Sequence, residues 1–499
     1  MFSYLRPRKG LRPLSLTCRW LRECCLNVLF HRCIAFADAL DDPTQSFPPP
    51  HLWRYVRALQ MYGRFRYRMR SSSSEVVADA ACGEGVLSDV LKAMPSLIHL
   101  IAMDEEERGV PWPILQVIFT VPQLRSLDLF GRLSVTDDAP SKPTLNASHI
   151  ISFRYVPRDE RKEPRSSASE KRIFGILLKK LAPNLEVLHL PCESVPFRKL
   201  DLWDWPRLQE LYLRGDGRRL AKAGTPLITV LRRMPHLRRL SLKLGRCTRQ
   251  RHLSAIWPPS CMVEAFPWPE LESLALSWVD PQEQLFEHLP ATFRDLRLRV
   301  WPRHYYLYSR PISLYSESGD NPPPSWAFET PSSSLLMQAL QKCRAPTLSS
   351  LELEYEADSD DIPMLRYIAQ SFPCLPSLHL FRYRSKQDWS PAPSENISAA
   401  LSPLQNLSTL RLFLDFHHIK RDPEKQIAYA ALLDLFRSII RYFTDRFSRS
   451  LRAVQMLLAD DEGYLLAGIQ LKLGPHRQAI RRTVSCIPAR PQHVGYCGL

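Results

Sequence analysis

Glycine is scarce in this sequence, with 17 residues in a chain of 499. Enzymes that bind nucleotides on an α/β sheet use glycine to bring the backbone close to phosphate, and average glycine usage is about 7%. The sequence also lacks a Cys-x-x-Cys motif and any apolar run of the roughly 18 residues that a membrane-spanning helix needs. These absences argue against a phosphate-binding enzyme, and we expect no cofactor, no bound metal and no membrane contact.

Basic residues outnumber acidic ones, with 67 Lys and Arg against 51 Asp and Glu and a net charge of +16. The excess is concentrated near the N-terminus, because the first 70 residues hold 13 cations and 4 acids. The hydrophobic content of 45% is typical of a folded protein. The 12 cysteines are scattered, which favours reduced and mostly buried thiols in a protein of the cytoplasm or the nucleus.

A short motif recurs along most of the chain: Pro, one residue, then Leu-x-x-Leu-x-Leu. Clear copies begin at Pro95, Pro122, Pro183, Pro206, Pro235, Pro269, Pro346 and Pro373, and degenerate copies begin at Ala291, Gln405 and Ser450. Several spacings between copies fall in or near the 20 to 29 residues of a leucine-rich repeat. The motif therefore predicts an α/β fold, an irregular leucine-rich-repeat solenoid shaped as a horseshoe.

The spacing of the leucines indicates how each repeat is built. The second and third leucines are two residues apart, so in a strand both point toward the core and their neighbours point to the opposite, concave face. Apolar residues at helical spacing lie between copies, as at Leu336 and Leu340 or Leu365 and Ile368, which predicts helices on the convex face. The proline ends the preceding helix. The alternative is a leucine-rich single-core domain whose strands begin alike.

Composition divides the chain into four predicted parts: a helical segment over 1–35, a basic linker or cap over 36–75, the solenoid over 76–474, and a flexible tail over 475–499. Two long gaps between motif copies contain sequence rich in Ser, Pro and charge. They predict surface insertions near 131–170 and 303–333.

The N-terminal segment has apolar residues at helical spacing, which predicts two short amphipathic helices that cap the solenoid. The run LSLTCRWLRE, followed by LNVLF, resembles the second half of an F-box. Together with the repeats, it makes the chain similar to fungal F-box/leucine-rich-repeat-like proteins. Only the second half of the motif is matched, so we expect an F-box that is degenerate or truncated at its N-terminus.

The resemblance implies a function. In such proteins the F-box binds the adaptor subunit of SCF-type cullin–RING ubiquitin ligases, and the repeats hold the substrate. The hydrophobic positions that the resemblance assigns to adaptor binding are Leu14, Leu16, Cys18, Leu21, Leu26 and Leu29. The chain is therefore expected to be a non-catalytic substrate receptor, with a leucine-rich-repeat scaffold without a ligase role as the alternative.

Residues that alternate with the buried leucines are the candidates for holding a protein client. Aromatic and charged side chains among them are favoured, because such side chains dominate interface energetics. The predicted client-binding residues are Phe130, His189, Tyr212, Arg214, Arg239, Lys243, Arg297, Arg299, Glu352, His379, Phe381, Arg411 and Phe413.

Two other motifs compete with this interpretation. The sequence from Val76 resembles motif I of S-adenosylmethionine-dependent methyltransferases, with Gly83 and Gly85 in the turn and Asp104 as the ribose ligand. Its second strand is itself a repeat copy, so a methyltransferase stays the weaker alternative. Arginines and aromatics interleave between Arg54 and Arg70, a pattern that can bind single-stranded nucleic acid. An exposed basic face explains it more simply, so no nucleic-acid partner is expected.

Overall fold

The computed structural model divides into two compact units, Met1–Leu211 and Tyr212–Leu499. The structure describes residues 11–36, 48–63, 82–104, 109–131, 133–134, 147, 149–156, 168–217, 224–247, 255–263, 265–300, 326–327, 330–384, 393–414, 438–439, 441–443, 446–447, 450–459, 465–472 and 481–486.

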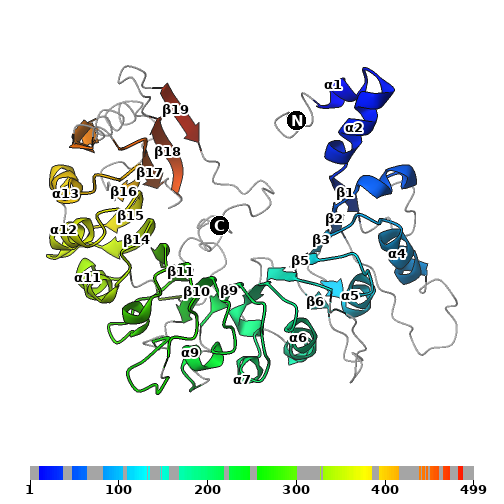
Figure 1. Ribbon diagram of the computed structural model, residues 1–499, viewed down its shortest axis with the longest axis horizontal. Helices are drawn as coiled ribbons and strands as arrows, with labels where there is room; N and C mark the ends of the chain where they lie inside the picture. The colour runs from blue at the N-terminus through cyan, green and yellow to red at the C-terminus, as the bar shows by residue number, and fades with distance from the viewer. Residues whose placement is uncertain are drawn as a thin grey trace, which may run out of the picture. The chain divides into compact units, whose positions relative to one another are not determined.

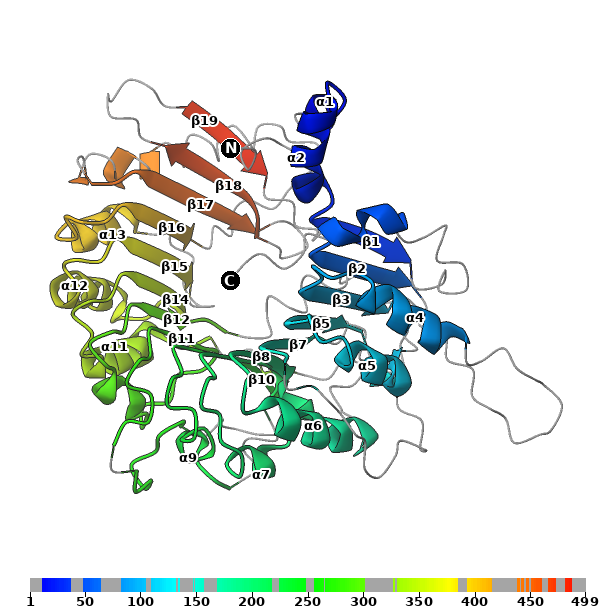
Figure 2. The ribbon, with the colours of Figure 1, turned by 45° about the vertical axis from the view of Figure 1, so that its right-hand side comes forward.

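The first unit is a stack of parallel strands with helices on one side. Its parallel strands, in order across the sheet, are β1 (Arg32–Phe36), β2 (Ala58–Gly63), β3 (His99–Asp104), β5 (Ser126–Phe130), β7 (Ser152–Val156) and β8 (Val187–Pro191). Its helices are α1 (Arg12–Ser15), α2 (Arg19–Leu29), η4 (Pro50–Tyr55), α4 (Cys82–Lys92), α5 (Trp112–Phe119), α6 (Ala168–Leu181), η5 (Cys192–Ser194) and α7 (Phe197–Leu200). Two short strands, β4 (Val110–Pro111) and β6 (Leu133–Ser134), pair apart from this sheet. Figure 2 shows β1, β2, β3 and β5 side by side with α4 and α5 along one face.

The second unit repeats the same plan, and the division between the units falls inside β9 (Glu210–Asp216). Its parallel strands, in order, are β10 (Arg239–Cys247), β11 (Ser273–Leu276), β12 (Asp295–Leu298), β14 (Ser350–Glu356), β15 (Ser377–Tyr383), β16 (Thr409–Leu414) and β17 (Ala453–Ala459). Antiparallel pairings add β18 (Leu465–Lys472) and β19 (Arg481–Cys486) after β17, and β13 (Trp326–Ala327) beside β10. The helices are α9 (Leu227–Val230), η6 (Leu285–His288), α11 (Ser333–Lys342), α12 (Asp361–Ser371) and α13 (Ser394–Leu401). Figure 1 shows α11, α12 and α13 along the same side of the strands.

The leucines of the motif form the core, as the sequence predicts. In the copy at Pro373, Leu375 and Leu378 are 0% exposed and Leu380 is 1% exposed. Equivalent positions in degenerate copies are also buried, as Phe293 shows at 0%. The fold is therefore an α/β solenoid of leucine-rich-repeat type within each unit.

In most of the clear copies the proline lies in a tight turn directly before the strand. The first leucine donates its N–H to the carbonyl three residues earlier, as from Leu237 to Met234 at 3.2 Å and from Leu375 to Phe372 at 3.0 Å. Proline then occupies the second position of the turn, where its fixed φ is favourable. The motif thus encodes this turn as well as the end of the preceding helix.

Several predicted boundaries are wrong. The solenoid starts before residue 76, because β1 and β2 already pair in parallel with β3. The predicted insertion near 131–170 contains a repeat strand, β7, and the start of α6, and the predicted tail contains β19. The predicted insertion near 303–333 lies largely outside the described residues. In the part of the chain that the structure describes, no helix is both long and apolar enough to cross a membrane.

Candidate functional site

The side chains that alternate with the buried leucines form one face of each sheet, which we call the strand face. Parallel pairing places equivalent residues of successive repeats side by side. In the second unit Arg297 of β12 lies opposite Glu352 of β14, which lies opposite His379 of β15, which lies opposite Arg411 of β16. The structure therefore brings together these four residues, which the sequence analysis proposed separately.

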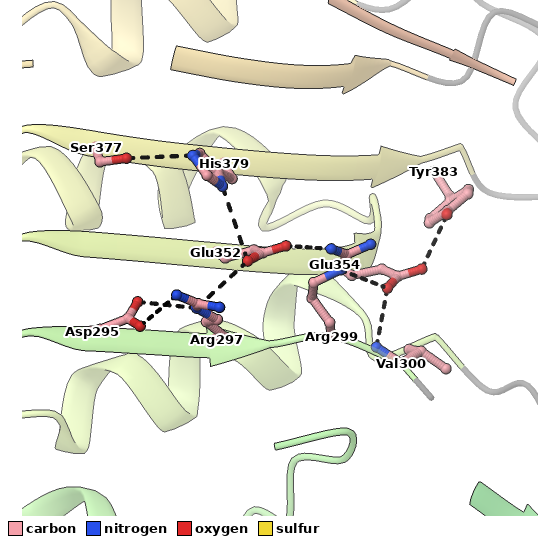
Figure 3. Close-up of polar contacts among 9 residues, drawn as sticks. All are labelled: Asp295, Arg297, Arg299, Val300, Glu352, Glu354, Ser377, His379 and Tyr383. Atoms are coloured by element: carbon pink, nitrogen blue, oxygen red, sulfur yellow. Dashed lines mark hydrogen bonds and ion pairs between the residues drawn. The ribbon is translucent and has the colours of Figure 1, made fainter. Parts of the chain in front are cut away.

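Two arginines and three carboxylates form the charged centre of this face (Figure 3). Arg297 Nη2 lies 2.8 Å from Asp295 Oδ2, and its Nε lies 3.9 Å from Glu352 Oε2. Arg299 Nη1 donates to Glu352 Oε1, and its Nε lies 3.8 Å from Glu354 Oε2. Glu352 thus contacts both arginines, which fixes their side chains across two strands.

Glu354 is fully buried, at 0% exposed, although the alternation rule places it on the strand face. Its carboxylate accepts hydrogen bonds from the Val300 backbone N–H at 3.1 Å and from the Tyr383 hydroxyl at 3.0 Å. A buried carboxylate needs such partners, because desolvation otherwise strongly disfavours its charge. Glu354 therefore links Arg299, Val300 and Tyr383 while it is itself fully buried.

The arginines shift the pKa of the groups around them. Burial, together with Arg411, Arg297 and Arg299, lowers the pKa of His379 from 6.5 to about 4, although Glu352 opposes the shift. Burial tends to raise the pKa of Glu352, but Arg299, His379 and Arg297 outweigh it and hold the pKa below its usual value. Glu352 is therefore ionised and His379 neutral at pH 7.

Aromatic side chains continue the strand face beyond the charges. The Arg299 guanidinium stacks over the Phe381 ring at 4.0 Å from its centroid, and the rings of Tyr383 and Phe413 lie 5.1 Å apart. Phe381 and Phe413 are only 4% and 6% exposed, because these neighbours cover them. The aromatics therefore support the charged centre rather than project from it.

The other predicted client-binding residues also lie on strand faces. In the second unit Tyr212, Arg214, Lys243 and Arg411 are half-buried, and Arg239 is exposed. In the first unit Phe130 and His189 are half-buried and lie in different rows. The structure gives their positions, and their role in binding stays a prediction.

The first unit has its own polar contact on the strand face. Asp128, 6% exposed, lies between His99 and Arg154 on the flanking strands, with its oxygens 3.2 Å from His99 Nε2 and 4.0 Å from Arg154 Nε. Its neighbour Ile101 is buried, at 7% exposed. One acid and two basic partners therefore make up this contact.

The N-terminal helices leave apolar side chains exposed. The thiol of Cys18 accepts from the Leu21 N–H at 3.4 Å and so caps α2, which explains why a helix begins at Arg19. Leu16 is 70% exposed. Trp20, which the sequence analysis missed, is 69% exposed in the first turn of α2, directly after the Cys18 cap. The other residues assigned to adaptor binding, Leu14, Leu21, Leu26 and Leu29, are half-buried.

The methyltransferase alternative gains no support from the described residues. Gly83 and Gly85 lie within α4, and a side chain at Gly85 would meet no atom within 4 Å. Nothing in the structure therefore requires a glycine at that position. The strand that follows, β3, lies between β2 and β5 as one member of the repeat stack. Across the described ranges, no group of three or more His, Cys, Asp and Glu side chains could hold a metal ion.

The stacked strands and helices define a protein of leucine-rich-repeat type. No family model and no curated protein matches the chain. Among solved structures it is similar to the crystal structure of the TLR13–ssRNA13 complex, with 12% identity and a TM-score of 0.26 over 73% of this chain and 37% of that chain. It is also similar to CroV588, described as a novel circular LRR protein, with 8% identity and a TM-score of 0.26 over 74% and 47% of the two chains. The chain thus spans less than half the length of either structure.

Proposed function

We propose that the chain is a non-catalytic interaction protein whose second unit holds a protein client on its strand face. The observation that carries this proposal is the ladder of Arg297, Glu352, His379 and Arg411 across adjacent strands, flanked by Phe381. Contacts within the ladder hold its side chains in place, so binding would cost little side-chain entropy. Arginine and aromatic residues are also the side chains that most often dominate binding energy.

Site-specific photo-crosslinking tests this proposal. A benzoylphenylalanine placed at Tyr212, on the strand face, should yield a defined crosslinked protein. Benzoylphenylalanine at Tyr367, on α12, is the matched control and should not yield that crosslinked protein. Crosslinking of the same proteins from both positions, or from Tyr367 alone, would contradict a client on the strand face.

We propose further that α1 and α2 bind the F-box-binding adaptor of an SCF-type ubiquitin ligase, which would make the chain a substrate receptor. The exposed Leu16 and Trp20 support this proposal, because burying two such side chains would contribute about 3–6 kcal/mol to association. A scaffold without a ligase role remains the alternative, in which these helices only cap the stack.

Binding of the purified adaptor to the full chain separates these two functions. The double variant Leu16→Glu, Trp20→Glu should abolish adaptor binding. Met262→Glu, which changes an apolar side chain that is 97% exposed in the second unit, should leave it intact. A wild-type chain that does not bind the adaptor would exclude the ligase role and leave the scaffold.

A further inference from the structure

Four cationic side chains gather on neighbouring strands of the second unit, and we call them the cationic cluster. They are Arg214 on β9, Lys243 on β10, and Arg297 and Arg299 on and directly after β12. All four are half-buried. Charges in such a setting act more strongly on a ligand than charges in open water, because the local dielectric is lower.

The strand in the middle of the cluster has only small side chains on this face. β11 pairs with β10 on one side and β12 on the other, with Ala275 opposite both Ser241 and Arg297. Ser273 and Ser277 precede and follow Ala275 on the same face. The long cationic side chains therefore flank a strip where no bulky side chain stands between them.

Two of the three carboxylates that pair with arginines of the cluster lie to one side of it. Glu352 and Glu354 form ion pairs with Arg297 and Arg299 from the β14 side. Asp295 lies on β12 itself, where it pairs with Arg297 and accepts a hydrogen bond from Ser273 of β11. Lys243 lies on the other side, and burial together with Arg214, Arg299 and Arg297 lowers its pKa to about 8, although Glu352 opposes the shift. The environment of Lys243 is thus dominated by positive charge.

We infer that the cationic cluster binds an acidic segment of the client, a short run of Asp or Glu side chains laid across β9 to β12. This inference rests on the proposed function, in which the client occupies this face. Strands in a sheet are about 4.8 Å apart, so the cluster spans about 14 Å. About four residues of extended chain cover that distance.

The same surface is a poor match for a nucleic acid. A longer polyanion following the row would next meet Glu352 and Glu354 on β14, where its phosphates would be repelled. Binding of single strands also relies on exposed aromatic rings for stacking, and the neighbouring Phe381 and Phe413 are buried. A short acidic peptide fits within the cluster and ends before Glu352 and Glu354.

Fluorescence anisotropy with the full chain and labelled peptides tests the inference. The probes are hexaglutamate, hexaglutamine and a hexauridylate RNA. Hexaglutamate should bind at least tenfold more tightly than hexaglutamine in 50 mM salt, and 300 mM salt should remove most of the difference. Lys243→Met and Arg214→Met should each weaken hexaglutamate binding about tenfold. Arg366→Met, which removes an exposed charge from α12, is the matched control and should change it less than twofold.

Three results would overturn the inference: equal binding of the two peptides, an equal loss for Arg366→Met, or tighter Lys243-dependent binding of the RNA. If a variant fails to fold, the salt dependence of hexaglutamate binding to the unaltered chain still tests the inference. The outcome is separable from that of the proposed function. If a client crosslinks at Tyr212 but hexaglutamate does not bind, the proposed function is supported and only the inference of an acidic segment is rejected.

Discussion

The strand faces of the two units use equivalent strand positions but differ in chemistry. In the first unit, one row of the face is apolar across five strands and consists of Phe36, Tyr62, Met103, Phe130 and Val156. On the same face, Asp128 lies near two basic side chains, those of His99 and Arg154. In the second unit, the equivalent row contains Glu354, Phe381 and Phe413. Three carboxylates hold two arginines on the same face.

This difference shows which part of a repeat the fold constrains. The inward residues are alike in both units, because each must fill the space between strand and helix. The outward residues contact only their neighbours on the same face, so they are free to diverge. The outward positions can therefore change while the core is kept, and the strand faces of the two units differ in chemistry.

The equivalence of the two cores predicts the largest effects. Leu127→Ala in β5 and Leu378→Ala in β15 each remove a side chain that is 0% exposed. Each should lower the free energy of unfolding by about 3–5 kcal/mol, because a cavity remains. Hydrogen exchange of amides in the affected strands measures this free energy. The controls are Ser126→Ala and Ser377→Ala, which should change the free energy of unfolding by less than about 0.5 kcal/mol. If only one of the two leucine variants lowered the free energy of unfolding by less than about 1 kcal/mol, the cores of the two units would not be equivalent.

The charged ladder predicts acid sensitivity in the second unit. The pKa of His379 is about 4 in the folded chain and 6.5 in its ordinary state. Between these values the unfolded chain binds the proton and the folded chain does not, so stability falls as the pH drops from 6.5 to 4. The loss is at most about 3 kcal/mol. Urea unfolding between pH 6.5 and 4 should show this loss of stability in the wild type and not in His379→Gln.

The exposed His51 of the first unit provides the control for this pH dependence. His51→Gln should leave the acid-dependent loss in place. If His379→Gln keeps the full loss between pH 6.5 and 4, the ladder is not its source.

The sequence predicts the repeats well where leucine is used and poorly where other apolar residues replace it. The copies in β2 and β7 read Val56, Leu59 and Met61, and Ile150, Phe153 and Tyr155, with the same spacing as the leucine motif. A search for large apolar residues at that spacing would have found both. Packing requires volume and apolar character at these positions, and several residue types supply them.

The composition of the charged centre was predictable, but its burial was not. Alternation along a strand correctly places Arg297, Glu352 and His379 on one face. The complete burial of Glu354 depends on Val300, which directly follows β12, and on Tyr383 of β15. Contacts between residues so far apart in the chain leave no local pattern in the sequence.

A smaller prediction compares the two polar contacts directly. Glu354→Gln keeps the shape of the side chain but removes the charge between Arg299 and Tyr383, and it should cost about 2 kcal/mol of unfolding free energy. Asp128→Asn in the first unit should cost about 1 kcal/mol, because its contact with Arg154 is long, at 4.0 Å. Urea unfolding at pH 7 measures both. Equal costs would show that the two faces depend equally on charge.

The smallest effect is expected at the apolar row of the first unit. Phe36 is 54% exposed on β1, so Phe36→Ser should change the free energy of unfolding by less than about 0.5 kcal/mol in thermal or urea unfolding. Phe413→Ser is its counterpart in the second unit, where the ring is 6% exposed and packs on Tyr383. That variant should cost several times more, since it buries a hydroxyl where an aromatic ring was covered. A large cost at Phe36 would mean that the apolar row supports the fold of the first unit, and the difference in exposure between Phe36 and Phe413 would then not explain the difference between their costs.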